Sequence, residues 1–179
     1  MRLLLNDASV LINLIATNRF VEIVAASGRQ YAICSTVRDE VKKLRDPSTG
    51  EMVSIDISPF LVSGLLRMLE LDGEAEESLY IEQATFVDDG EAMAIAIAAN
   101  RKIELAIDDR QATNHIRREF PDLVLLTTPD LLKAWADTDG VSCDDVSKAL
   151  IAVEKCARYF PPRTHPLCDW WNTMRGDEV

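Results

Sequence analysis

Residues 88–110 read DDGEAMAIAIAANRKIELAIDDR, and this stretch decides the fold of the chain. Its first half is rich in helix-forming residues and shows no polar face for two turns, and Asp88 or Asp89 can cap the helix that this composition predicts. Its second half is a short apolar strand, residues 103–107, which runs directly into two carboxylates. A helix that is apolar on all sides must be buried, so we expect this helix and strand at the centre of the domain.

Acidic side chains stand at both ends of this apolar unit. Glu91 lies on the first turn of the predicted helix, and Asp108 and Asp109 follow the predicted strand directly. Carboxylates that meet in a confined place raise one another's pKa unless a cation lies among them. The stretch therefore indicates a site as well as a core.

The bulk composition is that of an ordinary soluble globular domain. The chain has 179 residues, of which 47% are hydrophobic and 27% are charged, and this length suffices for one core without disulfides. Residues 1–5 briefly resemble a signal peptide, but Asn6 and Asp7 interrupt the apolar run, and no run reaches membrane-spanning length. The four cysteines lack paired spacing, so we expect reduced thiols in a cytoplasmic protein with no membrane partner.

The formal net charge of −11 argues at first against a nucleic-acid partner, because phosphate binding depends on lysine and arginine. The acids are unevenly distributed, however. Residues 70–91 hold nine acids and no base, which leaves the remainder of the chain near −2. Basic residues gather within residues 38–45 and 110–118. The chain can therefore still present local basic patches to a phosphodiester.

Strands and helices alternate along the chain. We expect strands at residues 3–5, 31–34, 52–57, 103–107 and 123–127, and helices at residues 10–16, 19–26, 35–44, 58–71, 73–84, 88–100, 110–120, 128–139 and 142–159. This alternation predicts a three-layer α/β/α domain with a central, mainly parallel sheet. We assign residues 1–137 to that domain. Residues 138–179 form a C-terminal helical extension, whose tail with Trp170 and Trp171 we expect to pack on the domain or on a second subunit.

Four acids are expected at one edge of the predicted sheet. Asp7 follows the first strand and Asp109 follows the strand at residues 103–107, while Glu40 and Glu91 lie in the first turns of helices that leave the same edge. In parallel α/β sheets, ligands bind at the carboxyl ends of the strands. Carboxylate oxygens without cysteine or histidine companions favour Mg²⁺ or Mn²⁺ over zinc. The sequence therefore predicts a divalent-metal site.

The segments that carry these acids resemble the PIN domain, a family of metal-dependent ribonucleases that includes the VapC-type toxins of bacterial toxin–antitoxin pairs. The segments are LLNDASVL at residues 4–11, STVRDEV at 35–41, GEAMAIA at 90–96 and LAIDDR at 105–110, and the resemblance covers about residues 1–137. It implies that Asp7, Glu40, Glu91 and Asp109 are the catalytic, metal-binding acids. Asp108 is a second candidate in the last segment, and counting from Glu91 favours Asp109.

The resemblance also implies a reaction and partners. The reaction is hydrolysis of RNA phosphodiester bonds, assisted by Mg²⁺ or Mn²⁺ through a bound water of lowered pKa. Ser9 is a candidate phosphate ligand, although a role as helix N-cap explains it equally well. Arg110 is a candidate contact for the scissile phosphate, with a solvent-facing role as the alternative. The implied partners are an RNA substrate and an antitoxin-like protein, and the tail with Trp170 and Trp171 adds a second copy of the chain in a homodimer as a further candidate.

The main alternative is a catalytically silent PIN-like fold that binds a protein or a nucleic acid through residues 70–91 or through the tail at Trp170 and Trp171. The net charge favours this alternative, whereas the ordered set of acids favours the nuclease. Receiver domains and haloacid-type phosphatases also place an aspartate after the first strand. The phosphatase needs a second aspartate where Ser9 stands, and the acid pair of a receiver follows its first strand rather than a late one.

Overall fold

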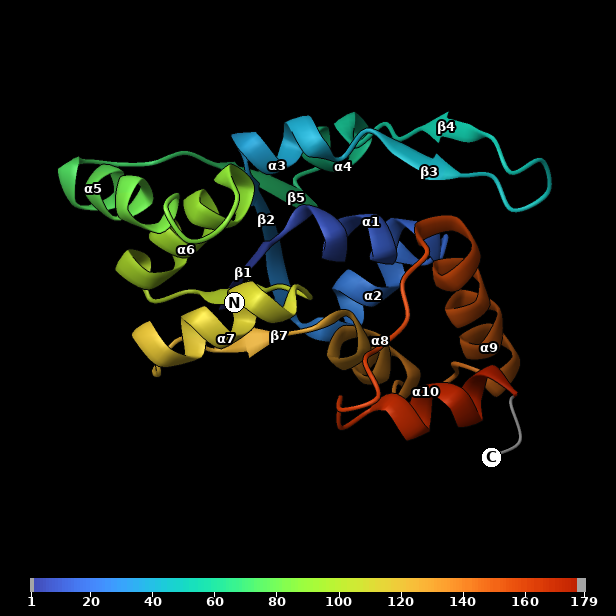
Figure 1. The fold of residues 1–179 in the computed structure, drawn as a ribbon. Coiled ribbons are helices and arrows are strands. Elements are labelled where there is room, and N and C mark those ends of the chain that lie inside the picture. The colour runs from blue at the N-terminus through green and yellow to red at the C-terminus, as the bar shows by residue number, and fades with distance from the viewer. Residues whose placement is uncertain (1, 177–179) are drawn as a thin grey trace.

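The computed structural model describes residues 2–176 and shows a parallel sheet between two layers of helices (Figure 1). Within these residues the sheet has five strands in the order β5-β2-β1-β6-β7, and every neighbouring pair is parallel. The strands are β1 (Arg2–Asn6), β2 (Arg29–Cys34), β5 (Leu66–Leu69), β6 (Glu104–Ala106) and β7 (Leu125–Leu126). The predicted three-layer α/β/α class is confirmed.

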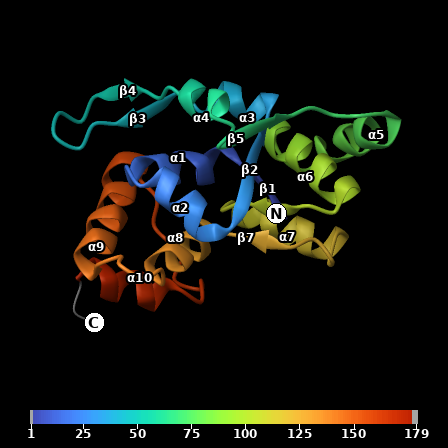
Figure 2. The same ribbon diagram turned by 180° about the vertical axis from the view of Figure 1, so that it is seen from behind.

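Each face of the sheet is covered by its own set of helices, as the two opposite views show (Figures 1 and 2). One set comprises α1 (Ala8–Ala16), α2 (Phe20–Ser27) and α8 (Thr128–Ala136), and the other comprises α5 (Glu74–Gln83), α6 (Asp89–Arg101) and α7 (Arg110–Glu119). Helix α6 packs against β1, β2 and β6, and residues 90–98 within it are buried. The apolar stretch therefore lies at the centre of the domain, as its composition predicts.

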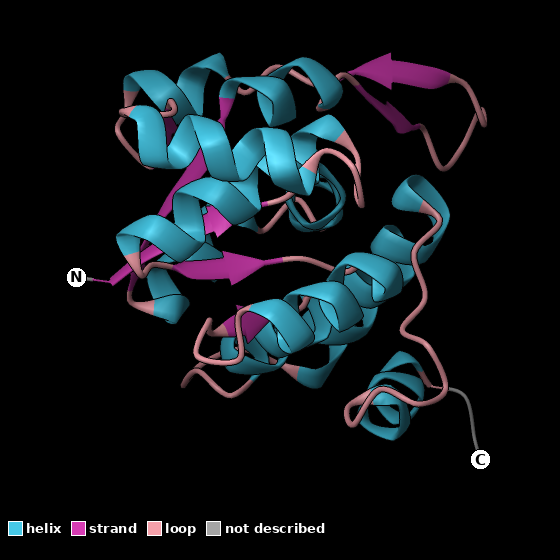
Figure 3. Ribbon diagram, turned by 60° about the vertical axis from the view of Figure 1, so that its left-hand side comes forward, coloured by secondary structure: helices cyan, strands magenta, loops and turns pink. Residues whose placement is uncertain are grey.

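The segment between β2 and α5 differs from the prediction in three places. The helix expected at residues 35–44 is only α3 (Ser35–Glu40), and β3 (Lys43–Arg45) follows it. The strand expected at residues 52–57 is only β4 (Met52–Ser54), which pairs antiparallel with β3 in a hairpin that extends away from the domain (Figure 3). Pairing between these two short segments overrides the helical propensity of residues 41–44.

The third difference is a strand that the sequence analysis misses. The helix expected at residues 58–71 is only α4 (Ser58–Val62), and β5 forms the edge of the sheet beside β2. Gly64 has a φ of +73°, which a right-handed helix does not accept. The helix therefore ends before Gly64, and residues 66–69 are free to pair with β2.

The C-terminal extension packs on its own chain. Helix α9 (Cys143–Ala152) continues as one π-helical turn, η1 (Val153–Ala157), so the helix expected to reach residue 159 ends slightly earlier. Helix α10 (Cys168–Arg175) lies against α9. Trp171 is fully buried, and its indole N–H donates to Glu154 at 2.8 Å, while Arg175 pairs with the same carboxylate at 2.8 Å. This buried ring and its hydrogen bond anchor the tail.

Two further expectations concern the chain as a whole. All four cysteines are free thiols, as their spacing predicts. From Arg2 to Gly176, no single helix has the length and hydropathy of a membrane span, and only α1 and α2 taken together, with a bend of 116° between them, satisfy the criterion by length and composition.

Candidate metal centre

The carboxyl ends of β1, β2 and β6 lie side by side, because β1 pairs with both of the other strands. Asp7 follows β1, α3 with Glu40 follows β2, and Asp109 follows β6. The backbone N–H of Asp7 donates to the carbonyl of Ala106 at 2.9 Å, which ties the ends of β1 and β6 together. Three predicted acids therefore leave the sheet at one edge.

Asp7 is both the N-cap of α1 and a buried acid. Its Oδ2 accepts hydrogen bonds from the backbone N–H of Ser9 at 3.1 Å and from the Ser9 hydroxyl at 2.5 Å. The prediction that Ser9 caps this helix is wrong, because α1 begins at Ala8 and Asp7 is the residue that accepts a hydrogen bond from a free backbone N–H of its first turn. Burial raises the pKa of Asp7, the bonds from Ser9 lower it, and the negative charge of Asp88 raises it further.

The start of α6 brings two more acids to this edge. Asp88 is the N-cap of α6, and its Oδ1 accepts from the backbone N–H of Glu91 at 2.8 Å. Glu91 is only 9% exposed. Burial, followed by the charges of Asp88, Asp7 and Asp109, raises the pKa of Glu91 to about 8. These electrostatic interactions show that carboxylates from three different elements share one small region.

Glu40 reaches the same region from the end of α3 by lying against Gly90. A β-carbon on residue 90 would lie 2.6 Å from Oε1 of Glu40 and 3.0 Å from Oε2, so only glycine leaves room for this carboxylate. Burial raises the pKa of Glu40, and the charges of Asp88, Asp7 and Asp89 add to the effect. Gly90 therefore provides a cradle for Glu40 on the first turn of α6.

The two neighbouring aspartates after β6 point to different surroundings. Asp108 accepts from the backbone N–H of Thr128 at 2.9 Å, its hydroxyl at 2.5 Å, the Asn13 amide at 3.0 Å and the Tyr159 hydroxyl at 3.2 Å. Burial raises the pKa of Asp108 to about 6, although these bonds lower it. Asp109 caps α7 by accepting from the N–H of Ala112 at 2.7 Å.

Asp109 also faces the other acids. It lines a hollow of about 260 Å³ together with Asp88 and Glu91, and its charge contributes to the raised pKa of Glu91. Asp108 does not line this hollow. Of the two aspartates, Asp109 is therefore the one directed toward the acidic cluster of Asp7, Glu40, Asp88, Glu91 and Asp109.

Two buried acids outside the cluster, Glu76 and Glu104, are neutralised by arginines. Glu76 pairs with Arg101 at 2.7 Å. Glu104 pairs with Arg29 and, at 3.1 Å, with Arg2. Burial alone would raise the pKa of Glu104, but the two arginines hold it below its usual value.

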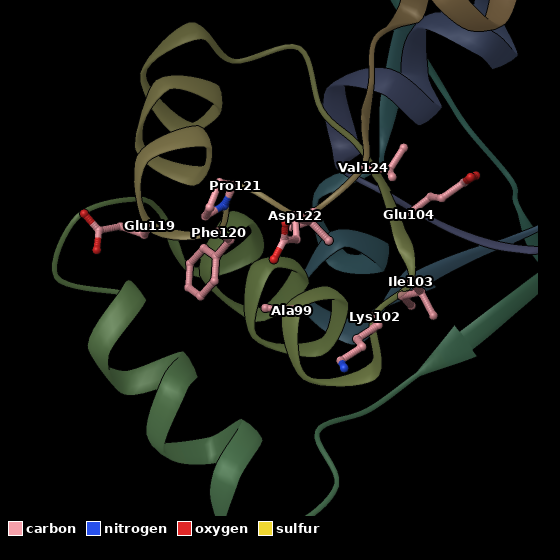
Figure 4. A pocket seen from close by; sticks show the side chains of 10 residues that line it. Ala99, Lys102, Ile103, Glu104, Glu119, Phe120, Pro121, Asp122 and Val124 are labelled. Atoms are coloured by element: carbon pink, nitrogen blue, oxygen red, sulfur yellow. The ribbon is translucent and has the colours of Figure 1, made fainter.

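Glu104 also marks a different hollow. It lines a cavity of about 400 Å³ at the amino ends of β6 and β7. The same cavity is lined by Lys102, Asp122 and Val124 (Figure 4). This cavity lies at the edge of the sheet opposite the acidic cluster. In the acidic cluster, by contrast, every side-chain charge that shifts the pKa of Asp7, Glu40 or Glu91 is another carboxylate.

The ordered acids and the parallel fold agree with a comparison against known families. A model of the PIN domain matches residues 3–119. The chain belongs to the PIN-domain family. No curated protein and no solved structure matches it significantly. PIN domains are nuclease-type folds that generally act on nucleic acids with the help of divalent metals.

The donor set of this PIN domain fits a hard divalent cation by its chemistry. The charged side chains that line the hollow at Asp88, Glu91 and Asp109 are all carboxylates, and the other lining side chains are apolar or amide groups. Mg²⁺ and Mn²⁺ prefer oxygen ligands of this kind. Within residues 2–176, no three His, Cys, Asp or Glu side chains are grouped closely enough to form a ready ligand set.

One acid of this cluster was not predicted as a site residue. Asp88 is expected from the sequence only as a helix cap, but its charge raises the pKa of Asp7, Glu40 and Glu91. The doublet of Asp88 and Asp89 immediately before Gly90 is the signal that points to it. Asp88 is thus both the N-cap of α6 and a member of the acidic cluster.

Proposed function

We propose that this PIN domain is an endoribonuclease that hydrolyses RNA phosphodiester bonds with Mg²⁺ or Mn²⁺ bound by Asp7, Glu40, Glu91 and Asp109. The observation that carries the proposal is that the side-chain charges acting on Asp7, Glu40 and Glu91 are those of other carboxylates, whereas the buried Glu76 and Glu104 pair with arginine. A divalent cation would remove the repulsion, and when bound it supplies a water of lowered pKa for attack on phosphorus.

The chain's own residues would hold the cation and orient the water. Glu91 and Asp7 lie on the rigid, buried supports of α6 and β1, and Glu40 is held by contact with Gly90. We assign Asp109 rather than Asp108 to the metal, because the oxygens of Asp108 already accept four hydrogen bonds from neighbouring groups. Asp108 then acts as a positioning residue that anchors the loop before Asp109.

The two predicted substrate contacts receive different roles in this proposal. Ser9 fixes the carboxylate of Asp7 through its hydroxyl, so it would orient a metal ligand rather than bind phosphate. The side chain of Arg110 is exposed and lies beside Asp109 in a surface groove. Its guanidinium is therefore available to a phosphate of the RNA.

A catalytically silent binding module is the second candidate. It is favoured by the absence of a ready ligand set among residues 2–176 and by the net charge of −11. The toxin role and the antitoxin-like partner remain predictions from the resemblance, and the homodimer and the cytoplasmic location remain predictions from the sequence.

A cleavage assay with a metal titration separates the two candidates. We expect wild-type protein to cut a single-stranded RNA in Mn²⁺ and to stop in EDTA, and we expect Asp7→Asn and Asp109→Asn to abolish cutting. The tetrapeptide Asp-Gly-Glu-Ala occurs twice in the chain, at residues 72–75 and 89–92. The matched control is Glu74→Gln, which changes an exposed acid at the position of the first copy that corresponds to Glu91 in the second. Failure of the wild type to bind Mn²⁺ at millimolar concentration in calorimetry would refute the nuclease and favour the binding module.

A further inference from the structure

A groove of about 690 Å³ runs along α7 next to the acidic cluster. Phe86, Asp109 and Gln111 line both this groove and the hollow that contains Asp88 and Glu91. The groove and the hollow therefore adjoin, and an extended polymer bound in the groove would pass directly beside the acids. Apart from Asp109 and Arg110, the residues that line this groove have no role in the proposed chemistry.

An exposed aromatic ring stands where the two spaces meet. Phe86 lies in the turn after α5 and is 52% exposed. Its ring stacks on the imidazole of His115, with centroids 5.0 Å apart and an angle of 25° between the planes. One face of Phe86 is thus supported by the protein, and the residue is too exposed to serve the core.

The imidazole beneath Phe86 is held from two sides. Nε2 of His115 lies 2.6 Å from Oε1 of the buried Gln83, and Nη2 of Arg118 lies 3.3 Å from Nδ1. Because Gln83 offers an oxygen and Arg118 offers only N–H donors, this pattern assigns the ring proton to Nε2. Hydrogen bonds in the ring plane leave the imidazole face free to support Phe86, so the stacked pair is a fixed platform.

Cations and amides surround this platform. Arg110 and Arg118 line the groove together with Gln111 and Asn114. Arginine contacts phosphate well because its planar donors fit two phosphate oxygens. An aromatic platform flanked by arginines is the arrangement that binds single-stranded nucleic acid, in which bases stack on the ring and the backbone follows the positive charge.

We infer that Phe86, supported by His115, is a stacking platform for one unpaired base of a single-stranded RNA whose neighbouring phosphate lies at the acidic cluster. This inference rests on the proposed ribonuclease function and specifies its substrate. Stacking tolerates every base, because each base has an aromatic face. Bases inside a duplex are already stacked, so the platform selects unpaired RNA and sets where along the strand the cut falls.

Binding measured without cleavage tests the platform independently of catalysis. Fluorescence anisotropy of a fluorescein-labelled, mixed-sequence RNA octamer in EDTA gives the affinity of each variant, with the octamer annealed to its complement as the double-stranded probe. We expect Phe86→Ala and Phe86→Leu to weaken binding of the single strand roughly 5- to 100-fold and Phe86→Trp to preserve it. The duplex should bind more weakly than the single strand to the wild type.

The control variant is Val124→Ala, which removes an equally exposed apolar side chain, also 52% exposed, at the amino end of β7 and therefore at the opposite edge of the sheet. Unchanged thermal unfolding of the Phe86 variants would show that they are folded. Affinity unaffected by Phe86→Ala, equal loss in Val124→Ala, or no octamer binding by the wild type would overturn the platform. If octamer binding depends on Phe86 but the wild type never cuts RNA, the platform stands and the nuclease proposal fails. If the wild type cuts RNA and Phe86→Ala binds normally, only the platform fails.

Discussion

Glu91→Gln is expected to stabilise the metal-free protein, by an amount that grows as the pH rises. Glu91 is 9% exposed, and burial together with neighbouring carboxylates raises its pKa from the usual 4.5 to about 8. Glutamine keeps the shape of the side chain but carries no charge. The substitution therefore removes the repulsion while leaving the packing at the start of α6 in place.

The sign and size of the effect follow from linkage. The folded state retains the proton of Glu91 up to about pH 8, whereas the unfolded chain releases it near pH 4.5. The contribution of Glu91 to the free energy of unfolding of the wild type is therefore largest below pH 4.5 and is lost as the pH rises toward 8. Each pKa unit corresponds to about 1.4 kcal/mol, so the loss has an upper bound of about 5 kcal/mol.

Urea unfolding in EDTA at pH 5, 6, 7 and 8 measures this difference. The free energy of unfolding of Glu91→Gln should nearly equal that of the wild type at pH 5 and exceed it by about 2 to 4 kcal/mol at pH 8. Saturating Mn²⁺ should narrow this difference, because a ligand at 100 times its Kd adds about 2.7 kcal/mol to a protein that binds it and less to a variant that lacks one metal ligand. The Glu74→Gln variant should follow the wild type throughout.

A pH-independent difference between Glu91→Gln and the wild type would refute the electrostatic argument. Equal stabilisation of both proteins by Mn²⁺ would remove Glu91 from the metal site. If Glu91→Gln is less stable than the wild type at pH 8 in EDTA, the negative charge of Glu91 is already balanced by other groups in the metal-free protein.

Three other substitutions test separate parts of the structure. Gly90→Ala should keep the free energy of unfolding or raise it by up to about 1 kcal/mol, because alanine favours the helix. It should weaken Mn²⁺ binding in calorimetry, because the new methyl group displaces the carboxylate of Glu40. Unchanged Mn²⁺ binding would show that Gly90 is not needed to place Glu40. Asp108→Asn should lower the free energy of unfolding in urea by about 1 to 3 kcal/mol, because donors around residue 108 lose an acceptor oxygen, and it should still bind Mn²⁺. Asp109→Asn should still cap α7 but lose Mn²⁺ binding. The opposite pattern would exchange the roles assigned to Asp108 and Asp109. Trp171→Ala should cost about 3 to 5 kcal/mol by emptying the space under α10, and a loss smaller than 1 kcal/mol in the same assay would mean that the tail contributes little to folding.

The sequence alone determined the class of the fold and most of the acidic cluster. Alternation of apolar strands and amphipathic or apolar helices specifies a parallel sheet, and acids placed directly after strands must gather at its carboxyl edge. Asp7 and Asp109 could be predicted for this reason, and Glu40 and Glu91 from their position on helices that leave the same edge. Short segments such as β5 could not, because its pairing with β2 is a long-range contact that local propensity does not encode.

Only the tertiary structure separated neighbours with the same chemistry. Asp108 and Asp109 are equivalent in spacing, but successive side chains leave a strand in different directions, so Asp108 meets Thr128 and Asp109 meets the cluster. The two copies of Asp-Gly-Glu-Ala are identical in sequence, and yet Gly73 is a left-handed residue before α5 whereas Gly90 is a helical residue that makes room for Glu40. A contact of this kind depends on where α3 packs against α6, and a local sequence pattern carries no information about which distant side chain will fill the space.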